Sequence, residues 1–187
     1  MIEYRPGEEA YDQALEKFGK KIPLYGWLAG GALRAFFAHE QVKDLDLFFA
    51  EAESVESAKE CFLDAGWSIV VDNATVLRMT RYRSSLDLVR MLFESPEKTL
   101  ENFDFTVACA ALSHEKLIVH DRFWFDLAAR RLTVNALPFP TASLVRLQRF
   151  AGRGYRACPE TIRQMALAFI GRTAEQINGE HLYHAVD

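Results

Sequence analysis

Two aspartates stand one residue apart in the strand-like run Lys-Asp-Leu-Asp-Leu-Phe-Phe, residues 43–49. Aspartate is depleted in β-strands, so the presence of two aspartates in this strand-like run suggests a chemical role. In an extended chain residues i and i+2 point to the same face, which places Asp44 and Asp46 on one side and Leu45 and Leu47 on the other. Two neighbouring carboxylates repel each other unless a cation or solvent screens them, and Mg²⁺ favours a few carboxylate oxygens together with substrate phosphates. The pair therefore predicts a site for Mg²⁺ or Mn²⁺; a solvated edge strand is the alternative.

Paired glycines precede this strand. An apolar strand that ends at Ala29 runs into Gly30 and Gly31, and a helical pattern follows. Glycine lets a ligand approach the backbone closely, and the amino end of a helix offers free N–H groups and partial positive charge, so the junction suits a phosphate. A plain tight turn is the alternative. Twelve residues separate Gly31 from Asp44, enough for one helix and a turn, so we expect the glycines and the carboxylates to be neighbours.

A third carboxylate, Asp87, lies in another apolar, strand-like run at residues 84–92. Three carboxylates are sufficient for a two-metal site, in which one ion activates an attacking hydroxyl and the other holds a triphosphate, with the ions about 3.5–4 Å apart. We expect Asp44, Asp46 and Asp87 to be the metal ligands, with Asp87 also activating the acceptor hydroxyl.

In their order and spacing these motifs resemble the DNA polymerase beta-like nucleotidyltransferase superfamily, and within it the head and neck of CCA-adding enzymes and bacterial poly(A) polymerases. The Gly-Gly-x-x-Arg motif of that family is similar to residues 30–34, its Arg-Arg-Asp-Phe-Thr segment to residues 102–106, and its neck helix to the segment around Arg146–Ala151. The resemblance covers roughly residues 22–170. It implies an α+β fold, a nucleotidyltransferase-type mixed sheet with flanking helices, followed by a small helical neck.

The resemblance also implies roles for two further residues, Arg34 at the phosphates and Asp104 near the bound nucleotide. Departures from the family pattern matter as much. Asn102 and Phe103 replace the paired arginines, Ala108 replaces an asparagine, and the Glu-Asp-x-x-Arg motif that reads the base aligns with Phe139, Pro140 and Ser143. By this resemblance, the chain retains the residues of the metal site and lacks the residues that usually select the base.

Taken together, we expect a Mg²⁺-dependent transfer of a nucleoside monophosphate from an NTP to an acceptor hydroxyl on an RNA end, a protein or a small molecule. The alternative is a non-catalytic nucleotide- or RNA-binding module that keeps the fold. We expect the head domain to span residues 1–135 and the neck-like segment residues 136–187.

The composition narrows the partners. The chain has 187 residues, half of them hydrophobic, and a formal net charge of −4, which disfavours broad attachment to nucleic acid by charge alone. No apolar run approaches the roughly 18 residues of a membrane span, and the start is too polar for a secretory signal, so we expect a cytoplasmic protein without membrane contact. Arginines at 146, 149, 153 and 156 form a helical stripe if one helix continues through Gly152 and Gly154; it is either a solvated face or an edge that faces phosphate or RNA.

Periodicity and turn residues predict the remaining elements. We expect helices near residues 8–18, 32–39, 54–65, 96–103, 124–132, 142–151, 160–169 and 174–184, and strands near residues 24–29, 45–49, 67–71, 75–80, 86–92, 107–112 and 116–119. The hairpin before Asp87 should turn at residues 83–85. Cys61, Cys109 and Cys158 are odd in number and widely spaced, which favours buried thiols over disulfides or zinc ligands.

Overall fold

The computed structural model describes residues 1–173, 175 and 177. Its centre is an eight-stranded mixed sheet in the order β1-β8-β7-β2-β3-β6-β5-β4. The strands are β1 (Ile2–Tyr4), β2 (Gly26–Ala29), β3 (Asp44–Phe49), β4 (Ser68–Asp72), β5 (Val76–Arg81), β6 (Ser84–Val89), β7 (Ala110–Leu112) and β8 (Leu117–Val119). Within this sheet β3 and β6 pair in parallel, and the other neighbours pair antiparallel.

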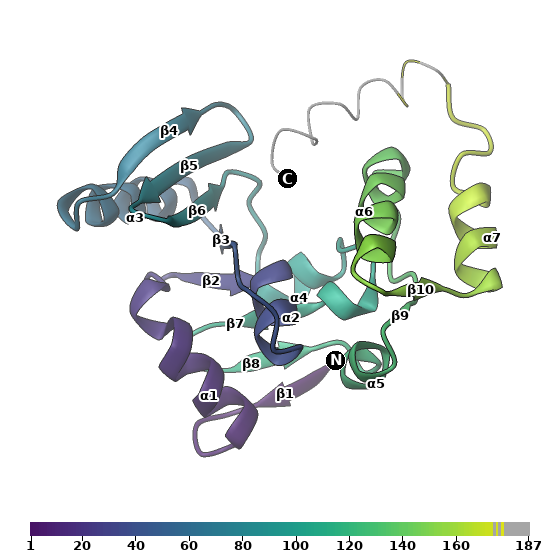
Figure 1. Cartoon of the computed structure of the whole chain (residues 1–187). Coiled ribbons are helices and arrows are strands. Elements are labelled where there is room, and N and C mark those ends of the chain that lie inside the picture. The colour runs from purple at the N-terminus through teal and green to yellow at the C-terminus, as the bar shows by residue number, and fades with distance from the viewer. Residues whose placement is uncertain (174, 176, 178–187) are drawn as a thin grey trace.

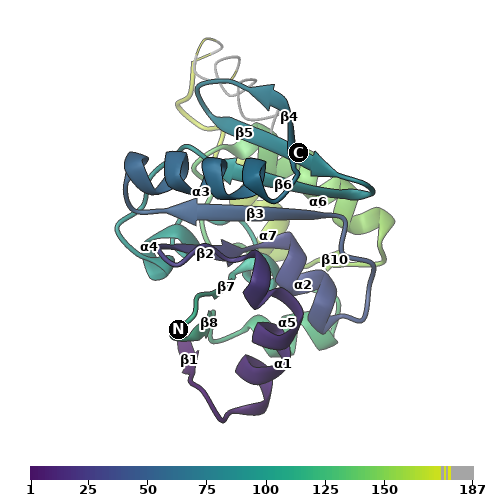
Figure 2. The same ribbon diagram turned by 90° about the vertical axis from the view of Figure 1, so that its left-hand side faces the viewer.

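Helices lie on both sides of the sheet. They are α1 (Glu9–Phe18), α2 (Gly31–Phe37), α3 (Ala52–Asp64), α4 (Pro96–Leu100), α5 (Phe123–Ala128), α6 (Pro140–Gly152) and α7 (Pro159–Leu167), with 3₁₀ turns at Gly19–Lys21 and Thr106–Ala108. Figure 1 shows α6 and α7 on the side of the molecule away from α3, and Figure 2 shows α1 and α3 in front of the sheet with α6 and α7 behind it. A short second sheet pairs β9 (Arg131–Leu132) in parallel with β10 (Arg156–Ala157).

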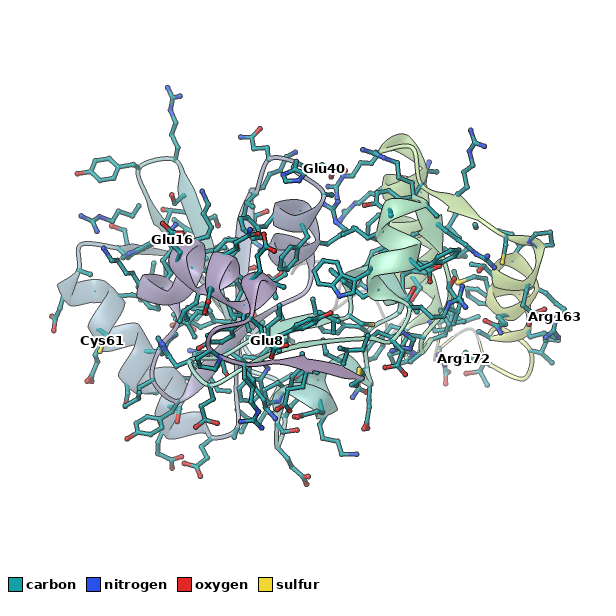
Figure 3. All side chains as sticks on the ribbon, turned by 90° about the horizontal axis from the view of Figure 1, so that it is seen from below. Glu8, Glu16, Glu40, Cys61, Arg163 and Arg172 are labelled. Atoms are coloured by element: carbon teal, nitrogen blue, oxygen red, sulfur yellow. The ribbon has the colours of Figure 1, made fainter. Side chains whose placement is uncertain are left out.

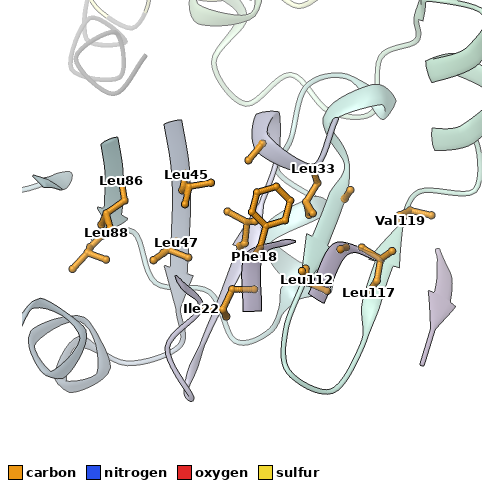
Figure 4. Close-up of a cluster of buried hydrophobic side chains, with 14 of the residues drawn as sticks. Phe18, Ile22, Leu33, Leu45, Leu47, Leu86, Leu88, Leu112, Leu117 and Val119 are labelled. Atoms are coloured by element: carbon orange, nitrogen blue, oxygen red, sulfur yellow. The ribbon is translucent and has the colours of Figure 1, made fainter. Parts of the chain in front are cut away.

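The main hydrophobic core lies between one face of the sheet and helices α1 to α3, and it continues into residues of α5, α6 and α7. Alternate residues of the central strands supply it, among them Leu45, Leu47, Leu86 and Leu88, and Phe18 of α1 belongs to the same cluster (Figure 4). A smaller cluster on the opposite face contains Phe48, Val89 and Leu100 of α4. Since side chains alternate along a strand, Asp44, Asp46 and Asp87 belong to this second face. The main core therefore fixes the strands while the carboxylates face the other way.

The α+β fold and most predicted elements are confirmed, and a few are corrected. The strand expected at residues 107–112 begins only at Ala110, because Thr106–Ala108 form a 3₁₀ turn. The helix expected to reach residue 132 ends at Ala128, and the last residues form β9. Strands β1 and β10 were not expected. The helix expected at residues 174–184 lies largely outside the described residues.

The cysteines are free thiols, but their burial differs from the expectation. Cys109 is buried, Cys158 is partly exposed and Cys61 is exposed. Cys61 lies on α3, whose inward face is formed by Val55, Ala58 and Phe62, so its own side chain turns outward (Figure 3). The prediction of a buried thiol is therefore wrong for Cys61.

The described residues include no helix that is long and apolar enough to cross a bilayer.

Candidate functional site

A cavity of about 940 Å³ lies over the carboxylate face of the sheet and reaches α6. One side is formed by Gly30, Gly31, Asp44, Asp46 and Phe48. The lining also contains the arginines Arg34, Arg90, Arg130, Arg146, Arg149 and Arg153. Pockets for drug-sized ligands usually measure about 300–1,000 Å³, so this one is large enough for a ligand of nucleotide size.

The carboxylates are placed by strand register. Asp46 on β3 pairs with Asp87 on β6, so the two side chains leave adjacent strands on the same face. Asp44 is exposed, Asp46 is partly exposed and Asp87 is 1 % exposed. Asp44 and Asp46 line the cavity, as expected from the alternation in sequence.

Asp87 is held by an arginine that sequence reasoning did not connect with it. Arg78 of β5 pairs with Asp87 across the β5–β6 hairpin, and its Nε and Nη2 donate to Oδ1 and Oδ2 at 2.8 and 2.6 Å. This hydrogen-bonded ion pair raises the pKa of Arg78, and the charges of Asp44 and Asp46 raise it further against the effect of partial burial. A guanidinium thus supplies positive charge to the three carboxylates.

The donor set fits a divalent cation in part. Mg²⁺ is commonly bound by one or two carboxylates plus substrate phosphates, which Asp44 and Asp46 can provide. In the part of the chain that the structure describes, no group of three or more His, Cys, Asp or Glu side chains is arranged to hold a metal ion. Arg78 binds both oxygens of Asp87 in this arrangement, and the role of Asp87 as third metal ligand and activator of the acceptor hydroxyl stays a prediction.

The two glycines differ in what they do. Gly30 has a φ of +86° and its missing Cβ would come within 3.1 Å of Phe103, so the turn into α2 requires glycine there. Gly31 is the first residue of α2 and lines the cavity, and a Cβ on it would meet nothing within 4 Å. A methyl group at position 31 would thus enter the open space of the cavity.

Arg34 is anchored by protein groups. It is 3 % exposed, and its Nη1 donates to Glu40 Oε2 at 2.6 Å and to Tyr155 Oη at 3.4 Å. Its guanidinium also lies near the rings of Phe150 and Tyr155, at 5.6 and 5.8 Å from their centroids. Glu40 follows α2, and Figure 3 shows it on the side of the molecule where α2 and α6 approach each other. Arg34 thus ties α2 to the segment that carries α6, besides lining the cavity.

Asp104 likewise has protein partners. Its Oδ1 accepts from the backbone N–H of Phe105 at 2.9 Å, and its Oδ2 accepts from Arg146 Nη1 at 2.9 Å. Because it is 5 % exposed, its main contribution is to position Arg146 of α6.

Ser143, one of the residues in place of the base-reading motif, is 1 % exposed and donates to the Phe139 carbonyl at 3.1 Å. Its hydroxyl is therefore engaged within α6. Phe139 and Ser143 both line the cavity.

Phe48 and Phe103 form an aromatic surface beside Asp46, with 5.9 Å between their ring centroids. Sequence reasoning missed this pair, because the contact joins a strand to a distant loop.

Comparison with solved structures supports the fold. The complex of a CCA-adding enzyme with CTP has a TM-score of 0.66 and 20 % identity, covering 96 % of this chain and 50 % of that one. The Thermotoga maritima CCA-adding enzyme with tRNA has a TM-score of 0.64 and 20 % identity, covering 96 % and 50 %. At this identity the likeness shows a nucleotidyltransferase-like fold.

A relative in Bacillus phage SPbetaL7, named Gabija anti-defense 2, is 27 % identical over 142 residues, which are 73 % of this chain and 35 % of that protein. The chain thus matches about a third of the relative's length. The family model described as Gabija anti-defense 2 family protein matches residues 9–130, well over half of the chain. The chain therefore belongs to the Gabija anti-defense 2 family.

Proposed function

We propose that this protein is a nucleotidyltransferase that moves a nucleoside monophosphate from an NTP to an acceptor hydroxyl. We propose further that it acts against Gabija defense, which its family's description names. The observation that carries the proposal is the cavity of about 940 Å³ in which Asp44 and Asp46 lie beside the Gly30-Gly31 turn, with several arginines in the same lining. Carboxylates bind cations and arginines bind phosphate, so the cavity offers side chains for both the metal and the triphosphate of a metal–nucleotide complex.

In the proposed reaction the acceptor oxygen forms a bond to the α-phosphorus, and the bond from that phosphorus to the oxygen leading to the β-phosphate breaks. Pyrophosphate leaves, and the acceptor proton passes to a base or to water. Such a transfer depends mainly on positioning and on charge stabilisation. A bound Mg²⁺ would be held by Asp44 and Asp46 and would lower the negative charge of the phosphates.

The chain's own groups would perform the rest. Gly31 leaves space for the phosphates, because a side chain there would enter the cavity. Arg34 contributes positive charge from a buried position, where Glu40 and Tyr155 fix its guanidinium. Arg146 and Arg149 of α6 lie in the same cavity and suit phosphate or ribose oxygens of the nucleotide or acceptor.

A second function is favoured by one observation. Arg78 binds both oxygens of Asp87, and Asp44 and Asp46 are the members of the acid cluster that line the cavity. A module that binds nucleotide or RNA without turnover would have this arrangement. In that case nucleotide would bind and no acceptor would be modified.

The experiment that tests the proposal is a screen for the acceptor. The purified protein is incubated with each of four NTPs labelled at the α-phosphate, with Mg²⁺ or Mn²⁺, and with total cellular RNA and protein as separate fractions. Label that becomes covalently attached to one fraction supports transfer and identifies the acceptor class. Saturable NTP binding without any labelled product supports the binding module.

A further inference from the structure

Three side chains form one row across three neighbouring strands. Asp46 of β3 pairs with Asp87 of β6, and Asp87 pairs in turn with Arg78 of β5. Directly paired residues project from the same face of a sheet, so the order on this face is carboxylate, carboxylate, guanidinium. Asp44, two residues before Asp46, lies on the same face. The row places the arginine at the end of the acid cluster.

The ion pair in this row is shielded. Asp87 is 1 % exposed and Arg78 is 27 % exposed at its side chain. Two parallel N–H···O bonds join them, the geometry in which arginine binds a carboxylate most strongly. Among the described residues that line the cavity, Asp44 and Asp46 are present and Asp87 is not. Arg78 therefore engages both oxygens of the third carboxylate from the far end of the row.

We propose that Arg78 is a positioning residue that withholds Asp87 from divalent metal, so that a metal ion meets only Asp44 and Asp46 until nucleotide phosphates supply further oxygens. The inference rests on the proposed function, since it takes the acid cluster to be the metal site. A guanidinium and a metal ion compete for the same carboxylate oxygens. The affinity of a protein site for a divalent cation such as Ca²⁺ or Mg²⁺ rises with the number of its charged ligands. Metal binding without nucleotide should accordingly be weak in the parent protein.

The experiment measures Mn²⁺ binding to the full chain without nucleotide, by electron paramagnetic resonance of free Mn²⁺. Arg78→Gln releases Asp87, so we expect its dissociation constant to fall on the order of tenfold below that of the parent. Arg81→Gln is the matched control, because Arg81 is exposed on the same strand and one charge is likewise removed, but its side chain points to the opposite face. Equal affinity in Arg78→Gln, Arg81→Gln and the parent would overturn the proposal.

A second variant separates ligand release from loss of charge and guards against misfolding. Arg78→Lys keeps the positive charge and loses the two-pronged contact with Asp87. We expect this variant to bind Mn²⁺ several-fold more tightly than the parent and to fold by circular dichroism. An unchanged affinity in folded Arg78→Lys would mean that charge alone explains any gain in Arg78→Gln, and would overturn the positioning role.

The outcome is separable from that of the proposed function, because the binding assay contains no NTP. If Arg78→Gln and Arg78→Lys bind Mn²⁺ more tightly and no protein transfers nucleotide, the positioning role stands and the transfer activity is wrong. If the parent transfers nucleotide and the variants bind Mn²⁺ as the parent does, the transfer activity stands and the positioning role is wrong.

Discussion

Asp104 and Arg146 join the segment after α4 to helix α6 through a hydrogen-bonded ion pair of 2.9 Å, and both residues line the same cavity. This contact fixes α6, with its further arginines, relative to the sheet that carries Asp44 and Asp46. The site thus depends on packing between two parts of the chain that lie 42 residues apart in sequence at this pair.

The first prediction concerns this link. Asp104→Ala removes the acceptor of both the Arg146 guanidinium and the Phe105 N–H, and hydrogen bonds to charged groups contribute about 1.5–3 kcal/mol each. Because Arg146 is partly exposed and solvent screens its charge, we expect the free energy of unfolding to fall by about 2 kcal/mol in total, measured by urea denaturation. Asp64→Ala, at the exposed end of α3, is the control and should change it by less than about 0.5 kcal/mol. Equal losses in both variants would contradict the link.

The second prediction concerns ligand space at the glycine turn. Gly31→Ala should fold normally, because an added Cβ meets no protein atom within 4 Å, yet weaken NTP binding by about tenfold, ~1.4 kcal/mol. Isothermal titration calorimetry with each NTP measures this loss. Gly152→Ala, at the last residue of α6 and outside the cavity lining, has equal space around its Cβ and should bind NTP as the parent does. Parental affinity in Gly31→Ala would place the phosphates elsewhere.

The third prediction is that the protein does not build CCA ends. Discrimination between bases needs paired polar groups that leave a wrong base unsatisfied. Here the aligned positions hold Phe139, Pro140 and Ser143, and the Ser143 hydroxyl is already bonded to the Phe139 carbonyl. Phe139 is suited to stacking, which tolerates every base. Competition among the four NTPs should therefore show weak selectivity, whereas ordered addition of C, C and A to a truncated tRNA would refute this prediction.

The fourth prediction concerns thiol reactivity. The Thr161 hydroxyl and backbone N–H lower the pKa of Cys158 to about 7, while burial raises the pKa of the Cys109 thiol. A lowered pKa means that the thiolate of Cys158 is the major form above pH 7 and is lost as the pH falls below it. We expect iodoacetamide labelling of Cys158, followed by peptide mass spectrometry, to rise with a midpoint near pH 7. Cys109 should stay unlabelled until the protein is denatured; labelling of both thiols at one rate would contradict the prediction.

Local patterns predicted the parts of the site that lie on one strand. Alternation of apolar and acidic residues was sufficient to place Asp44 and Asp46 on one face, because the side-chain period of a strand is fixed. The same reasoning predicted β3 to within one residue at its start. It also predicted the position of the glycine turn before α2, which the hydrophobic strand β2 and the following helix both support.

The pairing of Arg78 with Asp87 was beyond such reasoning, because it depends on hairpin register. The turn was expected at residues 83–85, whereas Arg81 pairs with Ser84 and the loop consists of Tyr82 and Arg83. Tyr82 has a φ of 55°, an uncommon conformation for an aromatic residue that the sequence does not signal. A slip of one residue would turn Arg78 to the other face relative to Asp87.

The predicted arginine stripe is a second feature that local sequence patterns could not place in full, because it depends on where helix α6 ends. Arg146, Arg149 and Arg153 line the cavity, but α6 ends at Gly152, and Arg156 lies in β10. Gly154 has a φ of +83°, which ends the helical path, so the fourth arginine leaves the stripe. The proposed boundary between residues 135 and 136 stays a prediction; strands β9 and β10, on either side of it, pair with each other.

The most direct test of the transfer activity compares NTP labelled at the α-phosphate with NTP labelled at the γ-phosphate, using the acceptor fraction found in the screen. We predict that only the α-label becomes covalently attached, that labelled pyrophosphate is released from the γ-labelled NTP, and that Asp46→Asn abolishes both while Asp64→Asn retains them. Attachment of the γ-label, or transfer by Asp46→Asn at the parental rate, would contradict the account.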